Sequence, residues 1–522
     1  MVGTFWAFVP AIVAIVLALL TKQVYVSLFI GILVGALLYA GGNPLQALGT
    51  LYTAMSEQIG GNTPIIVFLV VLGIFVVLMQ KSGGSKAYGE WAQQKIKSKE
   101  GALGATAALG CLIFVDDYFN CLTVGSVMRP ITDKFKVSHS KLAYIIDSTA
   151  APVCIIAPIS SWAAAVSGYL EGDGLVLFIN TIPFNIYALL TIVMVFVLCF
   201  TKLDFGKMKR NEYIAETTGD LDAGETDLPT EEAQVAINPL GKVRHLIIPV
   251  IVLIVCCIGG MIYSGFFYDW ETYTYGTTVQ SSSVIEAFSN CDAGTSLAIG
   301  STVALIIVAV YYLIEKVVSF KEITESFTQG FKTMVPAILI LTFAWTISGI
   351  MGAKGGYLDA QAFVQSNIEK IPEAVQSLFP AIFFVLACAI AFSTGTSWGT
   401  FGVLVPIAVA ILGANASPLV ILTISATLGG AVFGDHVSPI SDTTILASTG
   451  GNCNHVDHVK TQLPYALTVA GISFVAYIVA GFIAKLGFVW MGIIAWAVVA
   501  VLFVAVILLI KYLNKKNATE EA

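Results

Sequence analysis

Long apolar stretches alternate with short polar ones along almost the whole chain. Runs of roughly 17–25 apolar residues, the length at which an α-helix crosses a bilayer, recur from one end to the other. The pattern therefore predicts an all-α protein that crosses a membrane many times. We expect membrane segments near 5–20, 24–40, 62–80, 141–169, 174–200, 244–264, 297–314, 333–350, 419–446, 465–485 and 487–510.

Two pairs of apolar segments are shorter, at 101–132 and 379–413. Each arm has about 15 residues, which is too few to cross a bilayer comfortably, so each pair predicts a re-entrant helical hairpin. Basic residues at 81–99 and 129–141 flank the first pair, and lysine and arginine mark the inner side of a membrane. Counting onward, the second pair begins and ends outside. The two hairpins are thus expected to enter from opposite faces.

The two halves of the chain share short sequence features. A Pro-Ile pair ends each hairpin, and Ala157-Pro158-Ile159-Ser160 resembles Ser438-Pro439-Ile440-Ser441. Both tetrapeptides belong to apolar segments that proline interrupts, at 141–169 and 419–446. Inverted repeats with broken helices in matching places indicate a transporter whose site lies at the bilayer midplane. We expect a first repeat at 1–200, an acidic cytoplasmic linker at 201–243, a second repeat at 244–485, and a terminal helix and cytoplasmic tail at 486–522.

Composition and charge support this interpretation and add an orientation. Residues are 57% hydrophobic and 11% charged, against about 25% charged in soluble domains. The stretches 41–61 and 265–296, taken as outer loops, contain no lysine or arginine. This places the N-terminus outside and the C-terminus in the cytoplasm of a bacterial plasma membrane. Residues 211–241 are acidic without one basic residue, which predicts a solvated linker. Nothing in the sequence suggests a nucleic-acid partner.

The stretch Phe433–Thr444 carries the most unusual chemistry. Asp435, His436 and Asp442 lie there between apolar segments, and an ionisable group at membrane depth costs roughly 2.5–3.5 kcal/mol on insertion scales. Pro439 breaks the helix, and broken backbone at that depth persists only inside protein or beside a water-filled cavity. We expect a discontinuous helix whose oxygen atoms meet a small cation. His436 is either a pH sensor or a histidine hydrogen-bonded within the bundle.

Four oxygen-rich clusters fall where the repeats predict a site, at both hairpin tips and both helix breaks. Oxygen ligands suit hard cations such as sodium, and the nine cysteines have no metal-site spacing. A buried carboxylate resists ionisation and a bound cation reverses that preference, so one carboxylate holds either a proton or sodium. Sodium is expected chiefly at Asp435 and Asp442, with no cofactor besides the transported ions. The full predicted cation- and proton-binding set is Asp435, Asp442, Asp117, Asp147, Asp116, Asn120, Thr149, Ser393, Thr394, Thr396, Ser397, Ser438, Ser441 and Thr443.

With these residues in hand, the chain resembles the NhaC-type sodium/proton antiporters of the ion-transporter superfamily. The resemblance rests on 434–446, and Asp116-Asp117-Tyr118 and Ser393–Gly399 support it. It implies a homodimer with a fixed scaffold and an elevator-type moving domain made from the two hairpins and two broken helices. Some family members resemble sodium-coupled exchangers of malate and lactate, and others carry amino acids.

Several functions stay open. Sodium/proton antiport is the leading one, and coupled transport of a small organic acid or amino acid is the alternative. An intramembrane aspartyl protease would need glycine at position 432 for its Gly-x-Gly-Asp signature, and this chain has Val432. A passive channel has no need of broken-helix pairs in opposite orientations. We therefore expect a transporter and not an enzyme.

Overall fold

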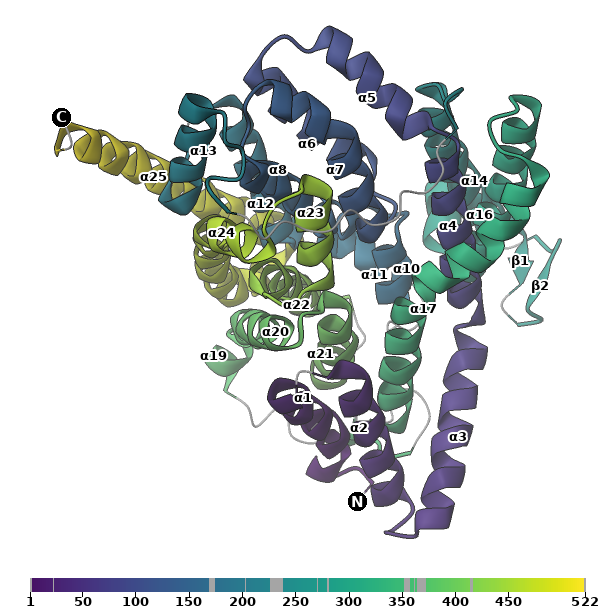
Figure 1. The fold of residues 1–522 in the computed structure, drawn as a ribbon. Helices are drawn as coiled ribbons and strands as arrows, with labels where there is room; N and C mark the ends of the chain where they lie inside the picture. The colour runs from purple at the N-terminus through teal and green to yellow at the C-terminus, as the bar shows by residue number, and fades with distance from the viewer. Residues whose placement is uncertain are drawn as a thin grey trace.

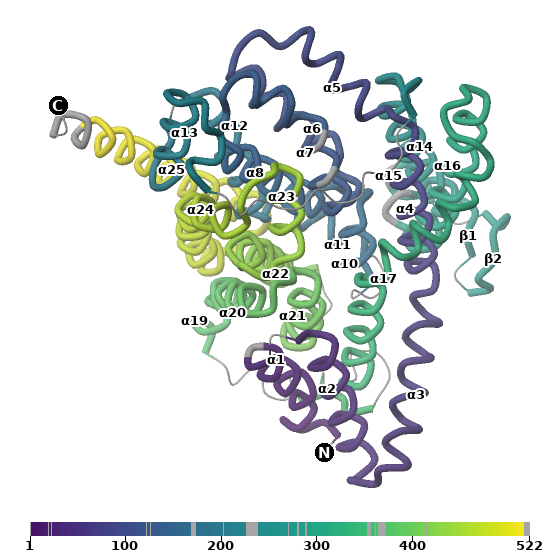
Figure 2. Tube along the Cα trace, viewed as in Figure 1, coloured from purple at the N-terminus to yellow at the C-terminus, as the bar shows by residue number. Residues whose placement is uncertain are grey.

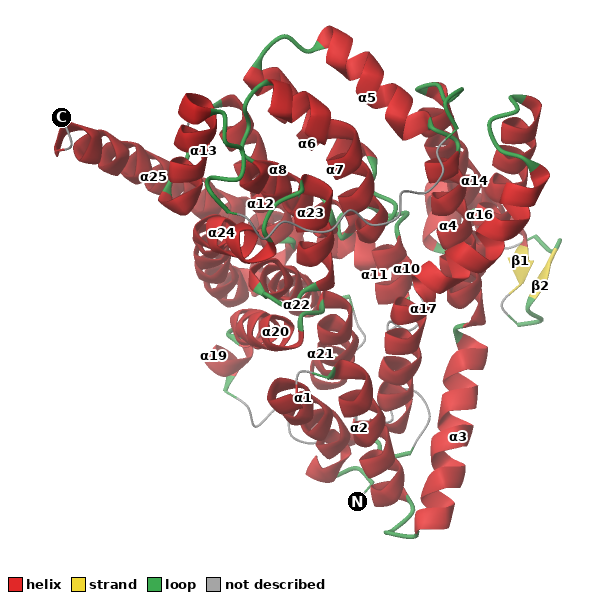
Figure 3. Ribbon diagram, in the orientation of Figure 1, coloured by secondary structure: helices red, strands yellow, loops and turns green. Residues whose placement is uncertain are grey.

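The computed structural model describes residues 2–21, 23–168, 174–201, 203–225, 238–269, 271–278, 281–351, 357–360, 362–363, 372–413 and 416–520. These residues are almost entirely helical, apart from one short pair of strands (Figure 3). The helices of the first half are α1 (Val9–Thr21), α2 (Val24–Tyr39), α3 (Pro44–Gly61), α4 (Thr63–Lys81), α5 (Gly84–Lys95), α6 (Lys99–Leu112), α7 (Asp117–Lys134), α8 (His139–Ser148), α9 (Ala151–Cys154), α10 (Ser161–Ser167), α11 (Gly174–Thr181), α12 (Ile186–Phe200) and α13 (Gly206–Thr218), with 3-10 turns at Phe5–Phe8 and Ile182–Phe184.

The second half begins with two long helices that flank the strand pair. Strands β1 (Tyr268–Asp269) and β2 (Thr274–Tyr275) are antiparallel. The helices of this half are α14 (Arg244–Phe267), α15 (Val284–Ser289), α16 (Ala293–Ile314), α17 (Phe320–Met351), α19 (Glu373–Gln376), α20 (Phe379–Thr394), α21 (Ser397–Leu412), α22 (Pro418–Val437), α23 (Asp442–Gly451), α24 (His455–Ile483) and α25 (Gly487–Glu520), with a 3-10 turn at Ala484–Leu486.

The helices gather into two groups (Figures 1 and 2). In one group, α17 packs along α2, α3 and α4, while α16 packs between α4 and α14. In the other group, α22 packs on α20, α21 and α24, and α23 packs on α7 and α8. The candidate residues lie in the second group. There α12, α20, α21 and α24 pack around α22 and bury nearly all of it.

The predicted membrane character is confirmed. Within the described residues, six helices are long and apolar enough to cross a membrane, or up to eight if each of two bent pairs is one span. One expectation was wrong, because most of the predicted outer loop 41–61 is helical, forming α3 (Pro44–Gly61). Asn43 caps this helix by accepting hydrogen bonds from the Leu45 and Gln46 backbone N–H groups, and Pro44 occupies its first turn. The chain bends by 119° between α2 and α3.

The solvated-linker expectation was also wrong for one face of α13, although residues 216–220 are exposed as expected. Helix α13 lies against the protein, with Asn211 and Glu212 buried. Glu212 pairs with Lys99 and Lys141, which come from α6 and α8. The acidic segment thus finds its countercharges on helices far away in sequence, which is why composition alone predicted solvation. The linker residues 226–237 lie outside the described part of the chain.

Each predicted hairpin forms as two adjacent, contacting helices whose tip contacts a helix break, while their re-entrant character and sides of entry stay predictions. Helices α6 and α7 form the first hairpin, and a side chain at Gly110 would collide with Thr149, where α8 ends. Helices α20 and α21 form the second hairpin, and a side chain at Gly395 would collide with the Ile440 carbonyl between α22 and α23. Matching contacts of this kind are what the repeats require, while the inverted relation itself stays a prediction.

Candidate functional site

Asp435 lies near the end of α22, where the chain leaves the helix. Its side chain is 2% exposed, and its Oδ2 accepts a 2.6 Å hydrogen bond from the Thr443 hydroxyl. Helix α22 ends at Val437, and α23 starts after Ser441, whose hydroxyl caps it by accepting from the Thr444 N–H. The interruption around proline therefore folds Thr443 back onto the carboxylate that precedes it in sequence.

Asp147 belongs to the same network, although it comes from α8. The Thr444 hydroxyl lies 3.2 Å from Asp147 Oδ2 and 3.2 Å from the Asp435 carbonyl oxygen, so it bridges the two residues. Gln462 Nε2 donates to the same Asp147 oxygen at 2.6 Å, and His458 Nε2 lies 3.4 Å from it. All of these side chains are buried. Thr444 thus links the carboxylate of Asp147 to the backbone of Asp435, two of the predicted residues.

The ring of His436 contacts a tyrosine of α12. Its Nδ1 lies 3.0 Å from the Tyr187 hydroxyl, and its carbonyl oxygen accepts from Gln462 Nε2 at 2.7 Å. The imidazole is therefore hydrogen-bonded within the bundle. The predicted pH-sensing role of His436 stays a prediction.

The tip of the first hairpin forms a second polar group. Asp116 caps α7 by accepting from the Phe119 N–H at 3.0 Å, and Asp117 Oδ2 accepts from the Trp162 indole at 3.1 Å. Trp162 packs on Trp398 and Phe401 from α21, with ring centroids 5.6 and 5.0 Å away. Asp117 thus lies beside an aromatic cluster to which both halves of the chain contribute.

Asn120 joins the first hairpin to the break after α8. Its amide nitrogen lies within 2.9 Å of the carbonyl oxygens of Gly110, Ile113 and Thr149. The predicted ligand Thr149 uses its own hydroxyl on the Ile145 carbonyl at 2.7 Å. These two residues therefore hold the hairpin tip to the helix break, and the Asn120 side-chain oxygen is left buried without a partner.

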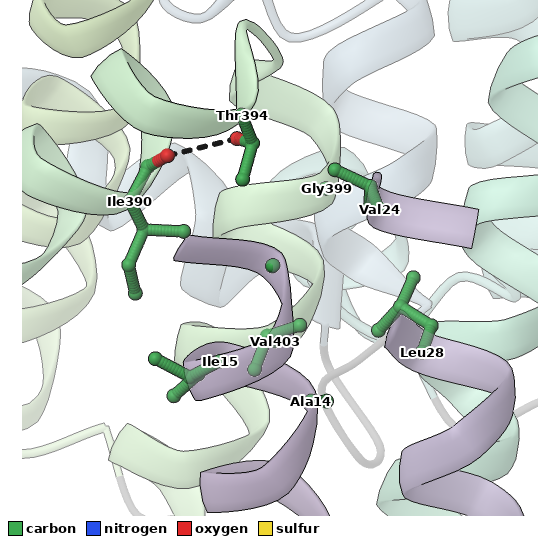
Figure 4. A pocket seen from close by; sticks show the side chains of 9 residues that line it. Ala14, Ile15, Val24, Leu28, Ile390, Thr394, Gly399 and Val403 are labelled. Carbon is green, nitrogen blue, oxygen red and sulfur yellow. Dashed lines mark hydrogen bonds between the residues drawn. The ribbon is translucent and has the colours of Figure 1, made fainter. Parts of the chain in front are cut away.

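The hydroxyls at the second hairpin tip are mostly engaged locally. Thr394 donates to Ile390, and Thr396 caps α21 by accepting from the Gly399 N–H. Ser397 is buried and Ser393 is half-buried near them. Thr394 also lines an apolar cavity of about 10 Å³ between α1, α2 and the hairpin (Figure 4). This cavity has room for about one water molecule and contains none of the predicted carboxylates.

Two further predicted residues lie at the rim of the Asp435 network. Ser438 donates to the Phe392 carbonyl at 2.7 Å and so ties the break in α22 to the second hairpin. Asp442 is exposed, and its nearest hydrogen-bond partner is the Tyr118 hydroxyl at 3.4 Å. Sodium binding by Asp435 and Asp442 together stays a prediction.

Sequence reasoning missed several members of this network. Neither His458 nor Gln462 is among the predicted site residues, yet both lie in α24 and are fully buried. Thr444 was noticed only as part of the motif. A buried glutamine in a membrane helix is itself unusual, because intramembrane polar groups need partners. That signal in the sequence could have identified Gln462.

Three comparisons place the chain among known proteins. A model of the Na+/H+ antiporter family matches residues 172–482. An uncharacterized protein of Haemophilus influenzae is 40% identical over 525 residues, which cover 97% of this chain and 95% of that protein. The NhaC-type assignment within the family stays a prediction.

Two solved transporters share less with the chain. The Alcanivorax borkumensis YdaH transporter is 15% identical, with a TM-score of 0.45 over 85% of this chain and 90% of its own. Neisseria gonorrhoeae MtrF, whose structure illuminates a class of antimetabolite efflux pumps, is 17% identical, with a TM-score of 0.41 over 85% of each chain. Neither likeness is close enough to support an argument about this chain's function.

Proposed function

The chain belongs to the Na+/H+ antiporter family and is therefore a secondary transporter, and from this premise we propose that it exchanges sodium ions for protons. The exchange is placed at Asp435. The observation that carries the proposal is the buried carboxylate of Asp435 at a helix break, whose backbone carbonyl is bridged by the Thr444 hydroxyl to a second buried carboxylate, Asp147. Ionisable groups are costly inside a membrane, and those that are present there commonly mark the path of a transported ion.

The proposed chemistry is a competition for one group. In a buried site, the carboxylic acid is stable because it carries no charge, whereas sodium stabilises the carboxylate. Asp435 therefore releases its proton when sodium arrives and takes one when sodium leaves. Thr443, which donates to Asp435 Oδ2, can instead present its hydroxyl oxygen to the cation. If the site faces the two sides of the membrane in turn, this competition exchanges the ions.

The remaining features of the proposal concern architecture. We place the protein in the bacterial plasma membrane as a homodimer, with its N-terminus outside and its C-terminus in the cytoplasm. The group containing α20–α24 would move, and the group containing α4, α14, α16 and α17 would stay fixed. The separation of the helices into these two packed groups supports this assignment.

The test uses proteoliposomes that contain a pH-sensitive dye. Sodium added outside should move protons out of vesicles that contain the wild-type protein. Asp435→Asn should abolish this signal, because an amide neither binds a proton near neutral pH nor neutralises a cation. Asp220→Asn is the matched control, since Asp220 is exposed and its carboxylate accepts a hydrogen bond from the nearby Asp222 N–H. Exchange by Asp435→Asn at wild-type rate would contradict the assignment of Asp435.

A second function is favoured by the surroundings of Asp117. A carboxylate beside the clustered rings of Trp162, Trp398 and Phe401 has the chemistry to hold an organic ammonium group. This alternative is sodium- or proton-coupled transport of an amino acid or a small organic acid. In the same vesicles, sodium alone would then move few protons until the solute is added.

A further inference from the structure

The two oxygen atoms of Asp147 differ sharply in their surroundings. Oδ2 is approached by three groups: the Gln462 amide at 2.6 Å, the Thr444 hydroxyl at 3.2 Å and His458 Nε2 at 3.4 Å. Oδ1 is buried and has no hydrogen-bond partner among the residues that the structure describes. Donors would be expected to distribute over both oxygens of a carboxylate that merely needed partners. Their concentration on one oxygen leaves the other open to a ligand.

Gln462 repeats this asymmetry. Its Nε2 faces two acceptors, Asp147 Oδ2 at 2.6 Å and the His436 carbonyl at 2.7 Å, so the amide can take only one orientation. That orientation leaves Oε1 buried and without a partner. A buried polar atom without a partner costs about 1–3 kcal/mol. Asp147 Oδ1 and Gln462 Oε1 belong to the two side chains that share the 2.6 Å hydrogen bond. The free-energy cost of burying both oxygens therefore arises at one pair of residues.

We propose that Asp147 Oδ1 and Gln462 Oε1 are ligands of a second monovalent-cation site, separate from the carboxylate of Asp435. One carboxylate and one neutral amide oxygen make an oxygen-only, singly charged ligand pair, which suits sodium or lithium. Among the described residues, no group of three or more His, Cys, Asp or Glu side chains is arranged to hold a metal ion. A divalent or transition-metal site is therefore not what these residues form.

Thr444 separates the two sites and connects them. Its hydroxyl contacts the side chain of Asp147 but only the backbone carbonyl of Asp435. The Asp435 side chain instead has its own partner, Thr443. Each carboxylate thus has its own set of neighbours. The inference rests on the proposed sodium exchange and deepens it, because it predicts two bound cations for each chain.

The test counts sodium ions bound to the purified full-length protein, with 22Na+ in a scintillation proximity assay and choline chloride as the balancing salt. The wild type should bind two ions, and Asp435→Asn and Asp147→Asn one each. Gln462→Met removes the amide at similar length, and should lose one ion or raise its half-saturating concentration at least tenfold. Ser473→Ala is the matched control on α24, since this buried hydroxyl donates to its own helix.

The outcomes separate the two proposals. No sodium bound to wild type would refute the proposed exchange itself. One ion in wild type, or two in Gln462→Met at unchanged affinity, would overturn the second site and leave exchange at Asp435 standing. If Gln462→Met does not fold, Gln462→Glu, which keeps an oxygen in place, should change the affinity for one ion at least tenfold. Unchanged affinity in Gln462→Glu would also overturn the second site.

Discussion

Replacing Glu212 by glutamine should release α13 from the protein. The Glu212 side chain is 6% exposed, and its carboxylate lies 2.7 Å from Lys99 Nζ and 3.6 Å from Lys141 Nζ. It also accepts a 2.7 Å hydrogen bond from the Ser138 N–H. Burial opposes its ionisation, but the charges of Lys141 and Lys99 outweigh burial and lower the pKa of Glu212. The residue is therefore charged at neutral pH, and Glu212→Gln removes that charge.

The magnitude follows from what the two lysines keep. Breaking a buried ion pair from one side costs about 3–5 kcal/mol when the other charge is left alone. Here Lys141 retains Asp204 at 2.8 Å, and Lys99 retains Glu216 at 2.9 Å. We therefore expect a smaller loss, about 2–3 kcal/mol. At about 1.4 kcal/mol for each factor of ten, the undocked population of α13 should rise roughly 30- to 150-fold.

Hydrogen–deuterium exchange of amides 206–218, in protein reconstituted into lipid nanodiscs, measures this population. Glu216→Gln is the matched control, because Glu216 also pairs with Lys99 but its side chain is 52% exposed. Exposed pairs contribute at most about 1 kcal/mol, so the control should exchange no more than about fivefold faster than wild type. Equal exchange in the two variants would show that the buried position of Glu212 does not hold α13.

Two further predictions concern pH and packing. Burial disfavours the charged form of His139, but hydrogen bonds to Asp133 and Asp222 outweigh burial and raise its pKa to about 9. That value exceeds the pKa of about 6.5 in the unfolded chain, so the stabilisation of the folded state by His139 is complete below about pH 6.5 and is lost as pH rises through 9. Scanning fluorimetry from pH 6 to 10 should show this loss in wild type and not in His139→Asn. Gly125→Ala should lower Tm, because a methyl group there collides with the backbone of α23 at a cost of about 1–3 kcal/mol, whereas Gly471→Ala, in open space, should not.

The hairpins and the helix breaks could be predicted because local features decide them. An apolar arm of about 15 residues is too short to cross a bilayer whatever it packs against. Pro439 follows the end of α22 and cannot extend the helix, because it lacks an N–H. Ser441 then caps the N-terminus of α23. Each of these signals lies within a few residues of its effect, so no tertiary contact was needed to find it.

The partners of Asp147 could not be predicted in this way. Gln462 lies 315 residues away from Asp147 in sequence, and Thr444 lies 297 residues away. Charge composition likewise predicted 211–241 as solvated. It could not show that Glu212 is neutralised by Lys99 and Lys141, because these lysines come from α6 and α8. Such long-range pairs of side chains depend on how distant helices pack against one another. The hydropathy pattern of the sequence does not determine that packing.

Helix α13 contacts α8 and α24, and the same two helices carry Asp147 and Gln462 of the proposed second cation site. Lys141, which pairs with Glu212 of α13, lies six residues before Asp147 on α8, about 9 Å along a helix. On α24, Asp457 accepts from Asn211 of α13 at 2.7 Å and lies five residues before Gln462. A shift of either helix at its α13 contact would therefore change the hydrogen bond between Gln462 and Asp147. Such coupling is reciprocal. The free energy by which docking of α13 changes sodium affinity at the proposed Asp147 site therefore equals the free energy by which sodium bound there changes the docking of α13.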